Sequence, residues 1–319
     1  MKRIANWMAA ILIILILPIS SRAAELVPVG RVIGLQLRSE AVTVAAFDDA
    51  LGRSARDAGL KIGDRILSVN GCPIREAEDV AQALEGQTTA AVTVQRGSRQ
   101  ATLKIPLQAT AQGRRLGIYL RQGIGGIGTV TWYDPETGRF GALGHGVSDS
   151  SGALLKMTGG SAYEAFVESV KKGKSGAPGQ LRGCADSPLA CGELLRNTPR
   201  GVFGKTSQSW EGDPIPVAEF EEISPGPATI RATVCVGEPQ DYSVEILKIY
   251  PRDRSDGRNF LLSVTDPRLL EATGGIVQGM SGSPIIQDGK LVGAVTHVLV
   301  NSPDTGYGIY IQNMLDAAG

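Results

Sequence analysis

The chain has 319 residues, of which 42% are hydrophobic and 20% charged, so it can bury a sizeable core and is not a largely disordered protein. Its 32 basic residues balance its 32 acidic ones, and this zero net charge gives no sign of a nucleic-acid partner. The combination of 41 glycines with only 5% aromatic residues favours short strands and turns over helical bundles.

Residues 1–24 have the layout of an export signal. Lys2 and Arg3 precede an apolar run over residues 7–19, and small residues close the segment. Cleavage after Ala23 or Ala24 would leave a mature charge of about −3. The apolar run is short for a membrane span, yet retention as an uncleaved anchor stays open beside cleavage. We therefore expect an exported protein, either secreted or anchored by this segment.

Four cysteines would then lie outside the cytoplasm: Cys72, Cys184, Cys191 and Cys235. Cys184 and Cys191 flank a short loop that contains proline, and spacing alone leaves both a disulfide and free thiols open. The sequence contains no CxxC motif and only two histidines, so we expect no metal site and no cofactor.

Residues 25–107 are predicted to form a first, small α/β domain. Short strands over residues 32–37 and 42–47 lead to a short helix at 54–58, and Asn70-Gly71 is a strong turn signal. A second helix is predicted over residues 76–84, where apolar residues follow helical spacing. Two further strands, over residues 91–95 and 100–107, complete the unit.

This unit resembles a PDZ domain. Gly34-Leu35-Gln36-Leu37 is similar to the carboxylate-binding loop of such domains, and residues 58–71 are similar to the segment that runs from their first helix to the central turn. The resemblance implies that an extended peptide binds as an added strand between residues 35–37 and the second helix, where Val80 and Leu84 would face it. The alternative is a filled groove, with the unit serving only to pack.

Residues 108–114 are predicted to be a short linker, and residues 115–319 a second domain made mostly of strands. The glycine-rich run at 123–128 lacks the lysine of a phosphate loop and does not precede a helix, so a nucleotide site is not expected. Residues 171–179 are predicted to be an exposed loop open to proteolytic nicking.

The run Gly279-Met280-Ser281-Gly282-Ser283-Pro284 has the composition of a nucleophile loop. Glycines on both sides permit a sharp turn, and the N–H groups of Gly279 and Ser281 are predicted to form an oxyanion hole. Ser283 is expected to support the turn. Taken alone, the same run is also typical of an ordinary hairpin loop.

A nucleophilic serine needs a base. His145 follows a predicted strand and lies between two glycines, whereas His297 lies within an apolar strand and is expected to be a satisfied core or wall histidine. Among the carboxylates, Asp149 follows the histidine closely and Asp288 lies in a hairpin turn, where it is expected to be solvated. Asp266 ends a strand before Pro267, and we choose it as the orienting acid, with a turn cap as the alternative.

These motifs closely resemble the stage IV sporulation protein B family of serine peptidases. The resemblance rests on residues 141–145, Thr265-Asp266-Pro267 and residues 275–284, and with the PDZ unit it covers nearly all of the mature chain. The serine segment is also similar to the nucleophile loop of chymotrypsin-like enzymes, which implies a mainly-β, double-barrel peptidase domain. The resemblance implies Ser281 as nucleophile, His145 as general base and Asp266 as orienting acid. Asp266 lies only fifteen positions before Ser281, whereas the chymotrypsin pattern places the acid much further from the serine.

The family resemblance also implies a role and a location. It implies export into the space between the two forespore membranes, cleavage of a membrane-bound regulator, and release of an intramembrane protease that activates a late sigma factor. It further implies self-cleavage, with the PDZ domain taking part in self-recognition and targeting. Two other hypotheses for the function remain. The protein could be a non-catalytic PDZ adaptor with a protease-like scaffold, or an envelope quality-control protease.

Overall fold

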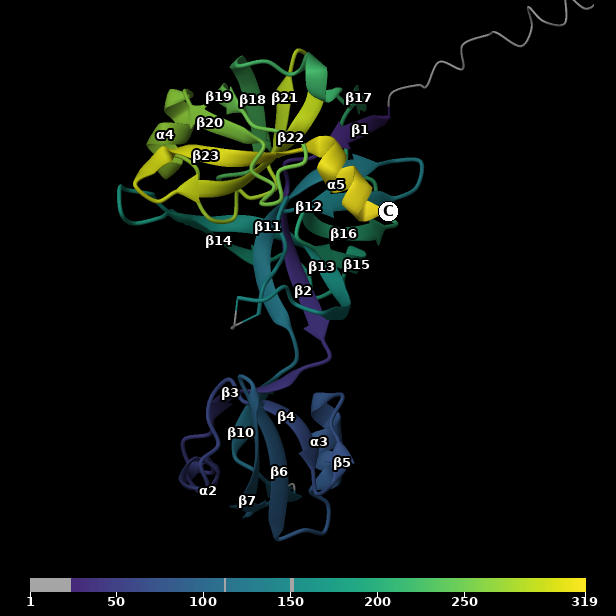
Figure 1. Ribbon diagram of the computed structural model, residues 1–319, viewed down its shortest axis with the longest axis vertical. Coiled ribbons are helices and arrows are strands. Elements are labelled where there is room, and N and C mark those ends of the chain that lie inside the picture. Colours follow the sequence, from purple (N-terminus) through teal and green to yellow (C-terminus); the bar gives the residue numbers. More distant parts are fainter. Residues whose placement is uncertain (1–23, 112, 150–151) are drawn as a thin grey trace, which may run out of the picture.

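The computed structural model describes residues 24–111, 113–149 and 152–319 (Figure 1). Two β-barrels lie together at one end, and a smaller α/β unit hangs below them, joined through β2 and β11. A PDZ unit with a mainly-β, two-barrel domain is the predicted fold class, and the prediction is confirmed.

The first barrel is a ring of six strands in the order β11-β2-β13-β15-β16-β12, closed by the pairing of β12 with β11. Apolar residues on alternate positions, such as Leu35, Leu37 and Phe140, fill its interior. The strands are β2 (Val32–Ser39), β11 (Ile124–Asp134), β12 (Arg139–Ala142), β13 (Met157–Lys171), β15 (Gly192–Thr198) and β16 (Gly201–Thr206). Outside the ring, β1 (Glu25–Pro28) and β17 (Ile215–Pro216) extend the sheet, and β14 (Gln180–Ala185) pairs with β13.

The second barrel is closed by six antiparallel strands in the order β18-β19-β20-β23-β22-β21. Phe260, Ile285 and Ile309 are fully buried in its core. The strands are β18 (Gly226–Ala232), β19 (Gln240–Ile249), β20 (Phe260–Val264), β21 (Pro284–Gln287), β22 (Lys290–Leu299) and β23 (Ser302–Tyr310). The final helix, α5 (Ile311–Ala318), returns to the first barrel, where Arg139 donates a hydrogen bond to the carbonyl oxygen of Ala318. The helix therefore ties the two barrels together.

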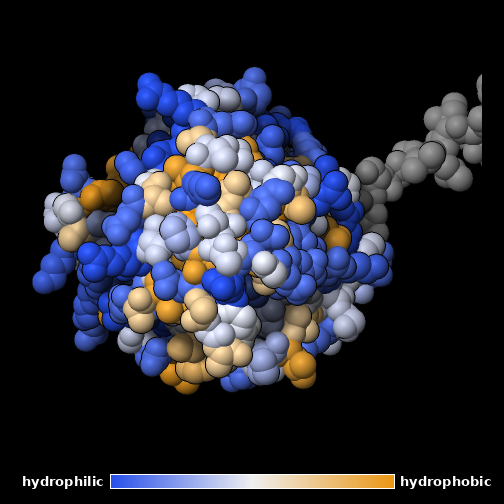
Figure 2. All heavy atoms as spheres, turned by 90° about the horizontal axis from the view of Figure 1, so that it is seen from below, coloured by the Kyte–Doolittle hydropathy of each residue, from blue (hydrophilic) through white to orange (hydrophobic). Residues whose placement is uncertain are grey.

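The PDZ unit packs two short helices against a six-stranded sheet. The helices α2 (Arg53–Asp57) and α3 (Ala77–Ala83) lie where the sequence predicts them. The strands are β3 (Val42–Phe47), β4 (Arg65–Val69), β5 (Cys72–Pro73), β6 (Thr89–Arg96), β7 (Arg99–Pro106) and β10 (Ile118–Arg121). Seen from this end of the molecule, small apolar patches lie among hydrophilic side chains (Figure 2).

The predicted domain boundaries are wrong at both ends of the PDZ unit. Strand β2 pairs with β11 and β13, so residues 25–39 belong to the first barrel. The PDZ unit instead spans residues 42–121, and its sheet is completed by β10, which pairs with β3. The predicted linker contains a hairpin of β8 (Gln108–Thr110) and β9 (Gly113–Arg115). An alternating strand pattern shows which face is buried, but not which strand lies beside it.

One wall of the predicted peptide groove is also wrong, because the domain boundary moves. Gly34, Leu35, Gln36 and Leu37 lie in a barrel strand, not in the PDZ unit. Val80 and Leu84 do line a PDZ cavity of about 980 Å³, but its other wall consists of residues 113–120, which lead into and include β10. The predicted helix side of the groove is therefore present, and residues 113–120 lie opposite it, where residues 34–37 were expected.

The predicted signal segment lies outside the described residues, apart from Ala24. Among the residues that are described, none of the helices is long and apolar enough to cross a membrane. All four cysteines are free thiols, so the disulfide between Cys184 and Cys191 that the sequence left open does not form in this structure.

Candidate active site

Ser281 lies in the loop between α4 (Pro267–Thr273) and β21, and two glycines shape this loop. Gly279 and Gly282 have φ angles of 99° and 98°, which L-residues rarely adopt. A Cβ atom on Gly282 would also lie 2.0 Å from the carbonyl oxygen of Thr129. The turn therefore requires glycine for both conformation and space, as the sequence predicts.

Hydrogen bonds fix the loop between the two barrels. The amide of Thr129 in β11 donates to the Ser281 carbonyl at 3.0 Å, and the Gly282 amide donates to the Val295 carbonyl in β22 at 2.7 Å. The hydroxyl of Ser283 is buried and donates to the Met280 carbonyl at 2.7 Å. Ser283 thus supports the turn from inside, and Ser281 is half-buried at the junction of the barrels.

The backbone N–H groups of the loop divide into two sets. Those of Met280, Gly282 and Ser283 donate to the carbonyls of Val277, Val295 and Met280. Those of Gly279 and Ser281 donate to no protein acceptor in the described part of the chain. Two unengaged donors beside a serine hydroxyl fit the predicted oxyanion hole, where a developing negative charge would accept both bonds.

Thr129 also brings the histidine segment to the nucleophile loop. Its carbonyl accepts a hydrogen bond from the Leu143 amide at 3.2 Å, while its own amide holds Ser281. Leu143 and Gly144 then turn the chain with φ angles of 70° and 68°, and His145 follows directly. Positive φ is rare for leucine, and such strain is common at functional sites. The fold thus joins the segments of His145 and Ser281 through one residue.

The imidazole of His145 is oriented by a neighbouring carbonyl. Its Nδ1 atom lies 3.0 Å from the Gly146 carbonyl oxygen, and because a carbonyl only accepts, Nδ1 carries the proton. Nε2 is then left with a free lone pair, as a general base requires. Burial lowers the pKa of His145 below its usual value, so the neutral, basic form prevails at neutral pH.

The serine hydroxyl is not yet engaged with this base. Ser281 Oγ donates to the Thr296 carbonyl oxygen at 2.8 Å, and the described residues contain no hydrogen bond between Ser281 and His145. The His145 ring instead packs beside His297, with centroids 5.2 Å apart. Burial, with the His145 charge, lowers the pKa of His297 to about 4. The hydroxyl must leave Thr296 before it can transfer its proton to the imidazole.

Asp266 is not at the imidazole, and the predicted contact with His145 is therefore absent from the described structure. The carboxylate caps α4 by accepting from the Arg268 amide at 2.9 Å, pairs with the Arg268 guanidinium at 2.8 Å and accepts from the Ser243 amide at 3.2 Å. An aspartate before proline at a helix start is a good N-cap, and this alternative accounts for the motif. Asp149 caps its own loop at Ala153, and Asp288 lies exposed in a hairpin turn.

Replacing Asp266 by alanine is expected to lower the free energy of unfolding by about 1–2 kcal/mol, because α4 loses its cap, and to leave cleavage largely intact. Arg268 and the Ser243 amide hold the pKa of this carboxyl below its usual range. The charged form therefore stabilises the fold above about pH 4, and this contribution is lost as the pH falls through the lowered pKa.

Thermal unfolding at pH 7 and at acid pH tests this structural role. Asp266→Asn keeps an acceptor for the cap but removes the ion pair. The wild type should therefore be more stable than this variant at pH 7, and the difference in stability should disappear at acid pH. A loss of kcat by orders of magnitude in Asp266→Asn, without a change in unfolding, would instead show that Asp266 orients the imidazole during catalysis.

Sequence reasoning missed three contributors. Thr129 and Thr296 hold the Ser281 loop and hydroxyl, and the Gly146 carbonyl sets the tautomer of His145. Thr296 and Gly146 act through their backbone carbonyl groups, and because every residue has such a group, the residue type gives no signal. Only the position of Gly146, directly after the base, offered a signal.

Comparison with known protein families accounts for both parts of the chain. The model for SpoIVB peptidase S55 matches residues 112–315, and a PDZ domain model matches residues 52–96. This chain belongs to the SpoIVB peptidase S55 family. It is a serine endopeptidase, as the nucleophile loop and the placement of His145 beside it lead one to expect. No protein in the curated set matched it.

Two solved structures are similar to the peptidase at low identity. A crystal structure of the Rv3671c protease in an inactive form is 14% identical, with a TM-score of 0.36, and covers 60% of this chain and 84% of the other. A serine-to-alanine mutant of Rv3671c from M. tuberculosis H37Rv, also in an inactive form, is 14% identical, with a TM-score of 0.37, and covers 60% and 82%.

Proposed function

We propose that this S55 peptidase is exported, cleaves itself and cuts a membrane-bound regulator during endospore formation. The cut would release an intramembrane protease that activates a late sigma factor. The single observation that carries the proposal is the family match over residues 112–315, which includes both His145 and Ser281. The site of action would be the space between the forespore membranes, reached through the N-terminal segment.

The state of the catalytic serine supports restricted cleavage over broad digestion. The Ser281 hydroxyl is held by the Thr296 carbonyl, and the His145 imidazole is turned to Gly146. A nucleophile and a base that must first be brought together are expected in a peptidase that acts only when a particular partner docks. Broad degradation of unfolded protein would need no such step.

The PDZ groove offers the docking site for such a partner. It lies between α3 and β10, where the β10 edge can accept an extended segment as an added strand. Tyr119 on this strand is exposed, and its hydroxyl donates to Asp48. The segment bound there would come from the membrane regulator, or from a second copy of this chain during self-cleavage.

Purified full-length protein can be tested against substrates of two kinds. One is a single-pass membrane regulator from the same cells, reconstituted in vesicles, and the other is an unfolded protein such as casein. We expect cleavage of the regulator at one or a few positions, little digestion of casein, and no cleavage by Ser281→Ala. Equal digestion of both would favour quality control. Failure of the wild type to cleave either or to react with a fluorophosphonate probe would favour an adaptor.

A further inference from the structure

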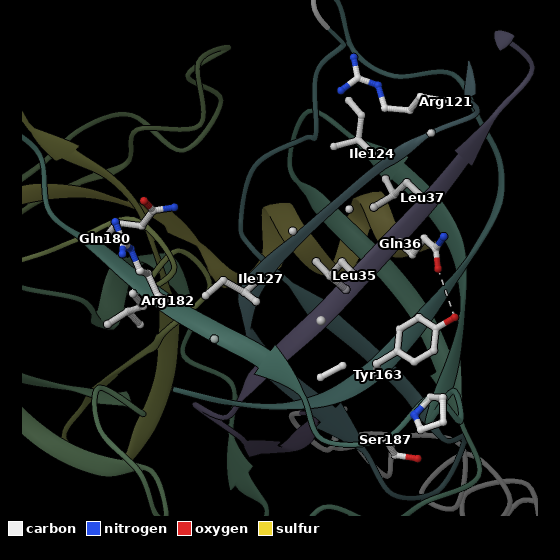
Figure 3. Close-up of a pocket in the computed structure, with 18 of the residues that line it drawn as sticks. Leu35, Gln36, Leu37, Arg121, Ile124, Ile127, Tyr163, Gln180, Arg182 and Ser187 are labelled. Atoms are coloured by element: carbon white, nitrogen blue, oxygen red, sulfur yellow. Dashed lines mark hydrogen bonds between the residues drawn. The ribbon is translucent and has the colours of Figure 1, made fainter. Parts of the chain in front are cut away.

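A second cavity lies on the first barrel, away from the PDZ groove. It has a volume of about 870 Å³ and runs between β14 on one side and strands β2 and β11 on the other (Figure 3). Residues 34–37 and 123–127, four of them glycine, form much of its wall. Because these glycines carry no side chain, a ligand can approach the backbone of β2 and β11 closely.

The strand β11 presents an open edge to this cavity. From residue 124 to residue 128 it pairs only with β2 in the described structure. The amide and carbonyl of Thr129 both point away from β2, since they bond with Ser281 and Leu143. Backbone direction alternates along a strand, so the N–H and C=O groups of Ile127 and Gly125 point the same way. Two residues thus offer free donors and acceptors for an added strand.

The cavity leads directly to the nucleophile loop. Gln180 of β14 forms a parallel bridge with Gln278, and the Leu181 amide donates to the Gln278 carbonyl at 2.8 Å. On the other side, the open edge of β11 ends at Thr129, which holds Ser281. From Gly125 to Thr129 the strand rises about 14 Å, enough for about four residues of an extended peptide beside Ser281.

The charged side chains that line the cavity are all positive. Arg121 lies at one end, where the chain leaves the PDZ unit, and Arg182 projects from β14 across the groove from Ile127 (Figure 3). Both arginines are exposed, and the described residues contain no carboxylate that pairs with either. The lining therefore favours a peptide with acidic side chains over a basic one.

We propose that this groove binds the substrate segment that follows the scissile bond. The segment adds as a strand to the edge of β11 at Gly125 and Ile127, and places acidic side chains near Arg121 and Arg182. His145 must protonate the leaving amine, and like β11 it belongs to the first barrel, so the leaving group lies on this side of Ser281. The inference rests on the proposed action on protein substrates.

Internally quenched peptides test the charge preference. They share one sequence before the scissile bond and carry aspartate, alanine or lysine two to four positions after it. We expect Arg182→Glu to lower kcat/KM for the aspartate peptide about tenfold and to raise it for the lysine peptide. A substrate whose leaving group is only a chromophore should be cleaved equally by both enzymes. Arg99→Glu, an exposed change on the PDZ unit, is the matched control and should behave as wild type.

Backbone pairing is tested with N-methylated versions of the aspartate peptide. Methylation at alternate positions after the scissile bond should raise KM, and methylation at the intervening positions should not, because only every second residue faces β11. The groove assignment is overturned if Arg182→Glu affects the chromogenic and aspartate substrates equally, or neither. If the wild type cleaves no substrate and Ser281 is not labelled by a fluorophosphonate, the proposed function fails instead.

Discussion

Replacing Ser281 by alanine is expected to reduce peptide cleavage by at least about 10⁴-fold, with the fold intact. In serine peptidases the loss of the nucleophile removes covalent catalysis and leaves only substrate binding and oxyanion stabilisation. The Ser281 side chain is half-buried and its hydroxyl makes one hydrogen bond, to Thr296, so alanine leaves no large cavity. The decisive measurements are kcat/KM on a peptide substrate and labelling of the protein by a fluorophosphonate.

Ser283 provides the matched control for this change. It lies two residues further on, but its hydroxyl is buried and donates to the Met280 carbonyl. Ser283→Ala should cost about 1 kcal/mol of stability from the lost hydrogen bond, while labelling at Ser281 persists. Labelling that survives in Ser281→Ala and disappears in Ser283→Ala would show that the wrong serine has been assigned.

Replacing His145 by alanine is expected to have a comparable effect, a loss of about 10⁴-fold or more in kcat. The Nδ1 proton on the Gly146 carbonyl leaves Nε2 as the only ring nitrogen able to accept the serine proton. His297→Gln is the informative comparison, because His297 is the only other histidine and packs against His145. We expect this variant to keep activity within about tenfold of wild type. Comparable losses in both variants would mean that the two rings act together.

The pH profile gives an independent check on His145. Burial lowers the pKa of its imidazole, and protonation removes the lone pair that accepts the serine proton. The acid limb of kcat/KM should therefore have its midpoint below about pH 6.5, the ordinary value for histidine. A midpoint above that value would show that the charged imidazole is stabilised during catalysis, as it would be beside a carboxylate.

The Gly146 carbonyl takes over one task of a triad acid. An acid in a triad fixes the tautomer of the histidine and stabilises its charged form. The carbonyl performs the first task through its bond to Nδ1, but as a neutral dipole it provides less for the second. This arrangement predicts a Ser–His dyad in the observed state, consistent with the engagement of Asp266 by Arg268.

Local chemistry was enough to predict the parts of this protein that depend on short stretches of chain. The glycines around Ser281, the turn that carries His145, and the helices containing Ala55 and Val80 are each encoded by neighbouring residues, through backbone freedom or helical spacing. The resemblance carried by these same stretches led to the peptidase family and to the two-barrel fold.

Only the tertiary structure decided which strands lie side by side and which polar groups meet. Gly34-Leu35-Gln36-Leu37 has a strand pattern that suits a PDZ edge or a barrel wall equally well, and pairing with β11 and β13 places it in the barrel. The sequence around Asp266 is compatible with a triad acid or with a helix cap. In the structure the guanidinium and amide of Arg268 both donate to its carboxylate, which therefore caps the helix. Alternation and residue type specify a face and a chemistry, whereas partners distant in the chain are set by the packing of the whole domain.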